Sequence, residues 1–163
     1  MNRIRTGAAR QALVVAAVLT AGAGVSAALV TNPASASTSP STFSFRIYPG
    51  TDHNVDLGRS GFSAGDQDLF TGNIVRAGKR VGHVVGSCTT VRVGSTSAVQ
   101  LCEWVLRLAH GQITATGSVS SGQHGPGTYA LPIVGGTGIY DRAAGQLEIT
   151  STNGSIPITV DLR

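Results

Sequence analysis

Residues 132–145, P-I-V-G-G-T-G-I-Y-D-R-A-A-G, decide how the rest of this sequence is interpreted. Glycine fills three of the four positions 135–138. Because glycine reaches positive φ without steric cost, this cluster predicts a tightly folded backbone corner. An apolar strand over 130–134 leads into the corner, and a second strand begins at Gly145. The segment 140–144 is too short for a stable free helix, so we interpret it as one helical turn that plugs the end of a β-structure.

A glycine-rich corner also suggests a nucleotide-binding loop. That site needs G-x-G-x-x-G between a strand and a full helix. Here Gly136 and Gly138 are followed by Tyr140 and Asp141, so the third glycine is missing, and the next element is a strand. The corner is therefore interpreted as structural, and no cofactor is expected.

The remaining sequence indicates an all-β domain. Val-, Ile- and Thr-rich runs recur between Gly- or Ser-rich turns, and long amphipathic helices are absent from the pattern, which is typical of a sandwich or barrel. We expect eight strands, over residues 43–48, 68–76, 81–93, 99–110, 112–119, 128–134, 145–152 and 156–162. Asn153-Gly154 marks a hairpin between the last two strands. Residues 49–64 are expected to form an irregular loop over one mouth. Eight strands close into a barrel that fills with side chains or holds one small ligand.

The first 36 residues have the pattern of an export signal. Three arginines precede an apolar run over 12–30, and Ala34-Ser35-Ala36 is a small-x-small cleavage site. The alternative is an uncleaved membrane anchor, since the apolar run is almost long enough to span a bilayer. The A-x-A site favours cleavage near Ala36, which predicts a secreted protein without a stable membrane partner. Residues 37–42 would be a flexible linker and 43–163 a single domain.

The charge distribution argues against nucleic-acid partners. The chain has 12 Lys and Arg against 8 Asp and Glu, and three of the arginines precede Ser37. The expected mature part is therefore nearly neutral, and it has no basic cluster with interleaved aromatic residues. The four histidines, His53, His83, His110 and His124, have no metal-like spacing, so no metal site is expected.

The two cysteines predict a disulfide bond. If Ser95 is the centre of a hairpin between the third and fourth strands, Cys88 lies directly opposite Cys102, within bridging reach. An exported chain with two cysteines favours oxidation. In the chain-entropy model, closing a loop of ~15 residues contributes about 3 kcal/mol.

Several short motifs resemble those of allene oxide cyclases and dirigent proteins. The corner resembles P-V-V-G-G-T-G of dirigent proteins and G-G-S-G-I-F-E-G-x-Y-G-Q-V of allene oxide cyclases. Four shorter segments upstream of the corner also resemble allene oxide cyclase motifs and occur in the same order as in that family: Gly65-Asp66, Leu69-Phe70-Thr71-Gly72-Asn73, Gly86-Ser87-Cys88 and His110-Gly111-Gln112-Ile113. The resemblance covers about residues 65–162. It implies an eight-stranded antiparallel barrel with one ligand cavity and, by analogy, a homo-oligomer.

The resemblance also implies candidate site residues. A family Asn maps onto Asn73, which we expect in the lumen positioning a ligand oxygen; a structural amide is an equal alternative. A cysteine implicated in the cyclase reaction maps onto Cys88, but a disulfide sulfur cannot act as nucleophile or base. The family's acidic residue on the first strand has no counterpart in 43–48. The fatty-epoxide cyclisation of the plant enzymes is therefore not expected.

Strand alternation adds further candidates. Glu103 and Arg107 alternate with Trp104, so the Trp104 face is predicted to line the lumen, with His110 on the same side. Tyr140, beside the corner, would anchor that segment or lie near a mouth. The apolar Phe70 and Ile74 are expected on the outer face of the second strand, where they would support oligomerisation. The predicted ligand-binding residues are thus Asn73, Trp104, His110 and Tyr140.

Two functions remain open from the sequence. One is a secreted barrel that binds a small apolar organic molecule and steers its cyclisation or coupling, as an isomerase or cyclase would. The other is a non-catalytic extracellular binding or structural barrel. An empty cavity lined by Asn73, Trp104 and His110 would favour the first, and a lumen packed solid by apolar side chains would favour the second.

Overall fold

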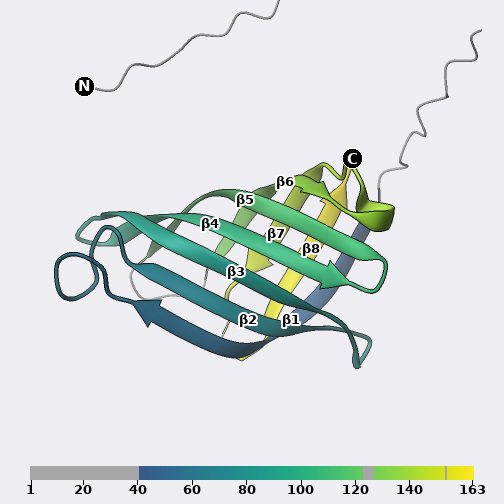
Figure 1. The fold of residues 1–163 in the computed structure, drawn as a ribbon, viewed down its shortest axis with the longest axis horizontal. Coiled ribbons are helices and arrows are strands. Elements are labelled where there is room, and N and C mark those ends of the chain that lie inside the picture. Colours follow the sequence, from purple (N-terminus) through teal and green to yellow (C-terminus); the bar gives the residue numbers. More distant parts are fainter. Residues whose placement is uncertain (1–40, 123–126, 153) are drawn as a thin grey trace, which may run out of the picture. The chain divides into compact units, whose positions relative to one another are not determined.

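The computed structural model describes residues 41–122, 127–152 and 154–163. They form a closed antiparallel barrel in which each strand pairs with the next and the last pairs with the first (Figure 1). The strands are β1 (Ser41–Val55), β2 (Gln67–Arg76), β3 (Lys79–Val93), β4 (Ser97–Leu108), β5 (Gly111–Gly122), β6 (Thr128–Gly136), β7 (Gly145–Thr150) and β8 (Ile156–Leu162). The predicted fold class and strand number are therefore confirmed.

The first strand is longer than predicted. Residues 49–55, expected in a loop, continue β1 and pair with β2 across a register shift between Pro49 and Asp52. The backbone N–H of Thr51 donates to the Thr71 hydroxyl, 3.1 Å away, which fixes the shifted segment to β2. Pro and Gly are typical of loops, but they are also tolerated at such bulges. Residues 41 and 42, expected in the linker, also belong to β1, while 37–40 and the predicted signal lie outside the described residues.

The glycine corner folds as a short cap on one end of the barrel. A 3-10 helix, η1 (Gly138–Tyr140), follows β6, so the predicted helical turn begins two residues earlier than expected. The N–H of Ile139 donates to the His110 carbonyl, which ties η1 to the β4–β5 turn. Gly138 has φ 64°, and a Cβ there would overlap the His110 carbonyl oxygen. The position therefore needs glycine for both its dihedral angle and its close backbone contact.

Alternate residues of the strands point into the barrel and form one apolar core. The most completely buried side chains are aliphatic, and every strand contributes at least one of them. This is expected for a small barrel that is filled by its own residues. They include Ile47, Ile74, Val84, Leu106, Ile113, Leu131, Leu147, Ile149, Ile158 and Val160. Among the described residues, no helix is long and apolar enough to cross a membrane.

The inward face of β2 is the opposite of the predicted one. Ile74 is fully buried and Phe70 packs on the core, whereas Leu69 and Asn73 are exposed on the outer face. The inner face contains Gly72, whose missing side chain leaves room for Ile47 and Val84. Both faces of this strand carry apolar residues, so the sequence does not show which face points inward. Choosing the wrong face places every side chain of the strand on the wrong side of the sheet. The prediction of Phe70 and Ile74 as an outer oligomer surface is therefore wrong.

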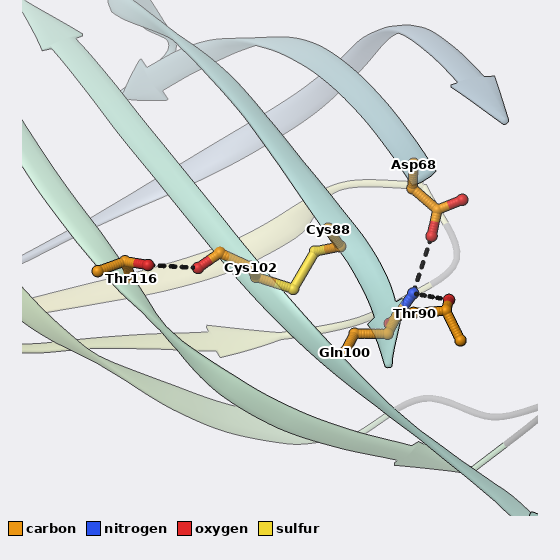
Figure 2. The surroundings of a disulfide bond; sticks show 6 residues. All are labelled: Asp68, Cys88, Thr90, Gln100, Cys102 and Thr116. Carbon is orange, nitrogen blue, oxygen red and sulfur yellow. Dashed lines mark hydrogen bonds between the residues drawn. A yellow bond between two sulfur atoms is a disulfide. The ribbon is translucent and has the colours of Figure 1, made fainter. Parts of the chain in front are cut away.

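The predicted disulfide is confirmed. Cys88 and Cys102 are directly paired in the β3–β4 register and their sulfurs are bonded (Figure 2). On the neighbouring strand, the Thr116 hydroxyl donates to the Cys102 carbonyl at 3.0 Å. This hydrogen bond connects the bridged pair to β5.

Candidate functional site

One end of the barrel opens into a cavity of about 410 Å³, which we call the mouth cavity. This end carries the β1–β2 and β3–β4 connections, while η1 and the C-terminus lie at the other end, which we call the far end (Figure 1). The cavity lies between the end of β1, the start of β2, β3 and β4, and residues near the β7–β8 connection. Its lining includes Ile47, Asp52, Asn54, Asp68, Phe70, Val84, Cys88, Gln100, Trp104, Tyr129 and Ile156.

Two aromatic rings form the floor of the mouth cavity. The ring centroids of Phe70 and Trp104 are 4.6 Å apart, and the ring planes are inclined by 53°. Gly86 is the residue paired with both, and a Cβ on it would lie 2.7 Å from Cε2 of Phe70. The absent side chain lets the Phe70 ring fold back beside the indole. The floor is thus an apolar surface that suits ring-shaped ligands.

A hydrogen-bonded carboxylate forms part of the wall. The Gln100 side-chain amide donates to Asp68 at 2.9 Å and to the hydroxyl of the buried Thr90 at 3.4 Å (Figure 2). The Asn54 amide donates to the other Asp68 oxygen. Two amides therefore orient one carboxylate at the cavity. A carboxylate held in this way can accept a further hydrogen bond or a proton from a ligand.

Two further titratable groups line the cavity. Asp52 is exposed, and Tyr129 is half-buried at the start of β6. Burial raises the pKa of the Tyr129 phenol above its usual value of 10.0, so this group is a neutral hydroxyl at physiological pH. Among the residues that the structure describes, no basic side chain belongs to the lining.

The loop after β1 is held beside the mouth by a second aspartate. The Asp66 carboxylate accepts hydrogen bonds from the backbone N–H groups of Leu57 (3.0 Å) and Ser63 (2.7 Å). These bonds lower the pKa of Asp66 below its ordinary 3.8. Backbone bonds between Gly65 and Thr90 and between Thr90 and Asp66 fasten the loop to β3. Asp66 therefore has a structural role, whereas Asp68, two residues later, lines the cavity.

The far end has a different construction. Phe43, Phe45 and Tyr140 cluster there, with ring centroids 5.2 Å apart for the two phenylalanines and 6.4 Å apart for Phe43 and Tyr140. The Arg76 guanidinium lies 6.0 Å from the Phe45 ring centroid. Burial raises the pKa of Tyr140, and the positive charge of Arg76 partly opposes this.

The structure separates the four predicted ligand-binding residues. Trp104 is 4% exposed and lines the mouth cavity, as its strand alternation indicated. Asn73 points outward from β2, so its predicted place in the lumen is wrong. His110 is exposed in the β4–β5 turn, because β4 ends at Leu108 and the alternation does not extend to it. Tyr140 packs at the far end, away from the mouth cavity.

Several cavity residues were missed from the sequence. Phe70 was placed on the wrong face, and Asp68 was not among the predicted site residues. Gln100 and Tyr129 gave no separate signal, although the confirmed Cys88–Cys102 pairing places Gln100 opposite Thr90 in the same ladder. Among the residues that the structure describes, no group of three or more His, Cys, Asp or Glu side chains is arranged to hold a metal ion.

Solved structures with this fold include several proteins that act on small molecules. A pyocyanin demethylase is 26% identical, with a TM-score of 0.68, over 76% of this chain and 100% of that chain. A Diels–Alderase, AbmU from Streptomyces koyangensis, is 16% identical, with a TM-score of 0.60, over 76% of this chain and 63% of that one. The pterocarpan synthase dirigent protein PsPTS1 is 15% identical, with a TM-score of 0.55, over 77% and 94%.

A search of curated proteins finds no match. Residues 50–157 include six complete strands, β2 to β7, the end of β1 and nearly all of the mouth cavity, and they match the family described as the allene oxide cyclase barrel like domain. The resemblance inferred from the short motifs is thereby confirmed: the chain belongs to the allene oxide cyclase barrel-like family.

Proposed function

We propose that this protein is an exported barrel that binds a small, largely apolar ring compound in the mouth cavity and steers its cyclisation or coupling. The observation that carries the proposal is the cavity itself, about 410 Å³, with an aromatic floor and an oriented carboxylate in its wall. Ligand sites are commonly apolar hollows of roughly 300–1,000 Å³ with a few convergent polar groups.

The residues support catalysis by confinement. Cys88 lines the cavity, but its sulfur is in the disulfide and supplies no thiolate. Holding a substrate in a reactive conformation needs few titratable groups, because orientation alone lowers the barrier. The Asp68 carboxylate and the Tyr129 hydroxyl would orient polar atoms of the substrate at the rim.

The charge of the cavity restricts the ligand class. Asp52 and Asp68 belong to the lining, and within the described ranges no Lys or Arg does. A bound anion would be repelled by these carboxylates, so neutral or cationic compounds are favoured. Pyocyanin demethylase, named for its action on a small molecule, shares this barrel over its full length.

Export is supported by the disulfide. Structural disulfides persist in oxidising compartments outside the cytosol. Cleavage near Ala36 predicts that the secreted protein begins at Ser37, which N-terminal sequencing would test directly. A chain that retains residues 1–36 on the membrane would contradict this part of the proposal.

A non-catalytic extracellular binding or structural barrel is the second candidate. It is favoured by the solid packing of the lumen beyond the aromatic floor, where aliphatic side chains are fully buried. It is also favoured by the hydrogen bonds of Asp68, because a carboxylate that already accepts from two amides is less available for proton transfer.

Native mass spectrometry of the secreted protein, incubated with lipid and polyketide extracts, tests the proposal. We expect a stoichiometric mass increase from a bound small molecule, lost in a Phe70→Trp variant whose larger ring enters the cavity. Isomeric products of the bound compound would support a cyclase, and release of the unchanged compound would support the binding protein. Repeated failure to load any compound would contradict the proposal and favour a structural barrel. The same spectra report the number of subunits, for which a homo-oligomer remains a prediction.

A further inference from the structure

Trp104 carries a hydrogen-bond donor without a partner. It is the only tryptophan in the chain, lies on the inward face of β4 and lines the mouth cavity. Its Nε1–H is completely buried and has no hydrogen-bond partner among the described residues. Buried indole N–H groups usually find an acceptor, because a buried donor without one has lost its hydration and gained nothing in return.

The neighbours of Trp104 identify which side chain can move to expose it. Cys102 and Leu106, on the same face of β4, are fully buried, and Cys102 is fixed by the disulfide. Phe70 is only half-buried, lies at the cavity and packs against the indole. It is held by ring contacts and by the space over Gly86 rather than by hydrogen bonds. A ligand in the mouth cavity would contact this ring, because Phe70 belongs to the lining.

We infer that the Trp104 indole N–H is the donor that recognises the ligand, and that Phe70 moves aside to admit it. The inference deepens the proposed function, on which it rests, by naming the ligand class. The ligand is a ring compound with a hydrogen-bond acceptor, a carbonyl, ether oxygen or ring nitrogen, on the edge that enters first. The carboxylates of Asp52 and Asp68 remain at the rim and disfavour an anionic acceptor.

This arrangement selects against compounds that lack the acceptor. Such a compound fills the same space but leaves the N–H unsatisfied, whereas an acceptor of matched shape gains the hydrogen bond. A tenfold difference in Kd corresponds to 1.4 kcal/mol, within the range for one such bond.

9-Fluorenone and fluorene form a matched pair of probes, because they share one ring system and differ in a carbonyl against a methylene group. Isothermal titration of the disulfide-bonded protein should give a Kd about tenfold lower for fluorenone. In Trp104→Phe the two Kd values should be equal. Leu101→Ala, on the exposed outer face of the same strand, is the matched control and should keep the tenfold preference.

A second readout needs no variant and covers the case in which Trp104→Phe does not fold. Because the chain has one tryptophan, its ¹⁵N-labelled form gives one indole N–H resonance. Fluorenone should shift this proton downfield by more than fluorene does. Equal binding of both probes by the wild type, with no difference in this resonance, would overturn the inference and leave the proposed function intact. Absence of binding by either probe would overturn both.

Discussion

The two ends of the barrel are built from the same strands but differ in what fills them. At the far end η1 is fastened to the β4–β5 turn, and its Tyr140 ring clusters with the two phenylalanine rings of β1. At the mouth the inward positions are a glycine, a retracted phenylalanine and polar side chains that hydrogen-bond to one another. A closed barrel therefore holds a ligand-sized cavity only where its inward side chains are small, displaced or polar.

Truncating an aliphatic side chain should cost more in the far half than at the mouth. Leu147→Ala removes a fully buried side chain and leaves an empty space, which should lower the free energy of unfolding by about 3 kcal/mol. Ile156→Ala, at the half-buried cavity wall, should cost about 1 kcal/mol, because that site already borders a cavity. Urea denaturation measures both. Equal losses would mean that the mouth is packed as tightly as the far half.

Removing the disulfide should act mainly on the mouth. Replacing Cys88 and Cys102 by serine reopens a loop with a sequence separation of 14 and should lower stability by about 3 kcal/mol or somewhat less. Amide hydrogen exchange should accelerate in β3 and β4 near Gln100 before it does in β7. Uniform acceleration through the barrel would show that the bridge does not stabilise the mouth preferentially.

The cap at the far end depends on Gly138. Gly138→Ala should destabilise by roughly 2 kcal/mol or more, since it combines a positive φ with an overlap with the His110 carbonyl. Gly154→Ala is the matched control, because its φ is 105° but a Cβ there meets nothing within 4 Å. Thermal unfolding of both variants separates the steric contact from the dihedral strain. If Gly138→Ala is no less stable than Gly154→Ala, the close contact between residue 138 and the His110 carbonyl does not limit stability.

The smallest expected effect is the pH dependence of the loop beside the mouth. Asp66 has a lowered pKa, so its hydrogen bonds are complete above about pH 3.8 and are lost as the pH falls through the folded-state value. Below the folded-state pKa the Leu57 and Ser63 amides should lose protection relative to their intrinsic exchange rates, while η1 at the far end is unaffected. Asp66→Asn should show faster exchange already at neutral pH. If the protection of the Leu57 and Ser63 amides does not decrease in acid in the wild type, the structural role assigned to Asp66 is wrong.

The sequence predicted the frame better than the site, for physical reasons that single residues show. Strand number, the all-β class and the Cys88–Cys102 pairing follow from local patterns, and the closed barrel follows from the resemblance of the short motifs; the structure confirms all of them. The inward face of β2 did not follow, because Phe70 and Leu69 are both apolar and Gly72 hides the inner alternation. His110 was misplaced because alternation cannot show where β4 ends. Asp68 joins Asn54 and Gln100 only when β1 to β4 pair in the correct register, so no local pattern marks it.

The most direct test of the account is to map ligand contacts by NMR on the disulfide-bonded protein, with fluorenone as the probe. The account predicts chemical-shift changes at the amides of Asp68, Phe70 and Gln100 and at the Trp104 indole, with Ile139 and Tyr140 unchanged. Changes centred on Tyr140 and His110, with the mouth residues unaffected, would contradict it.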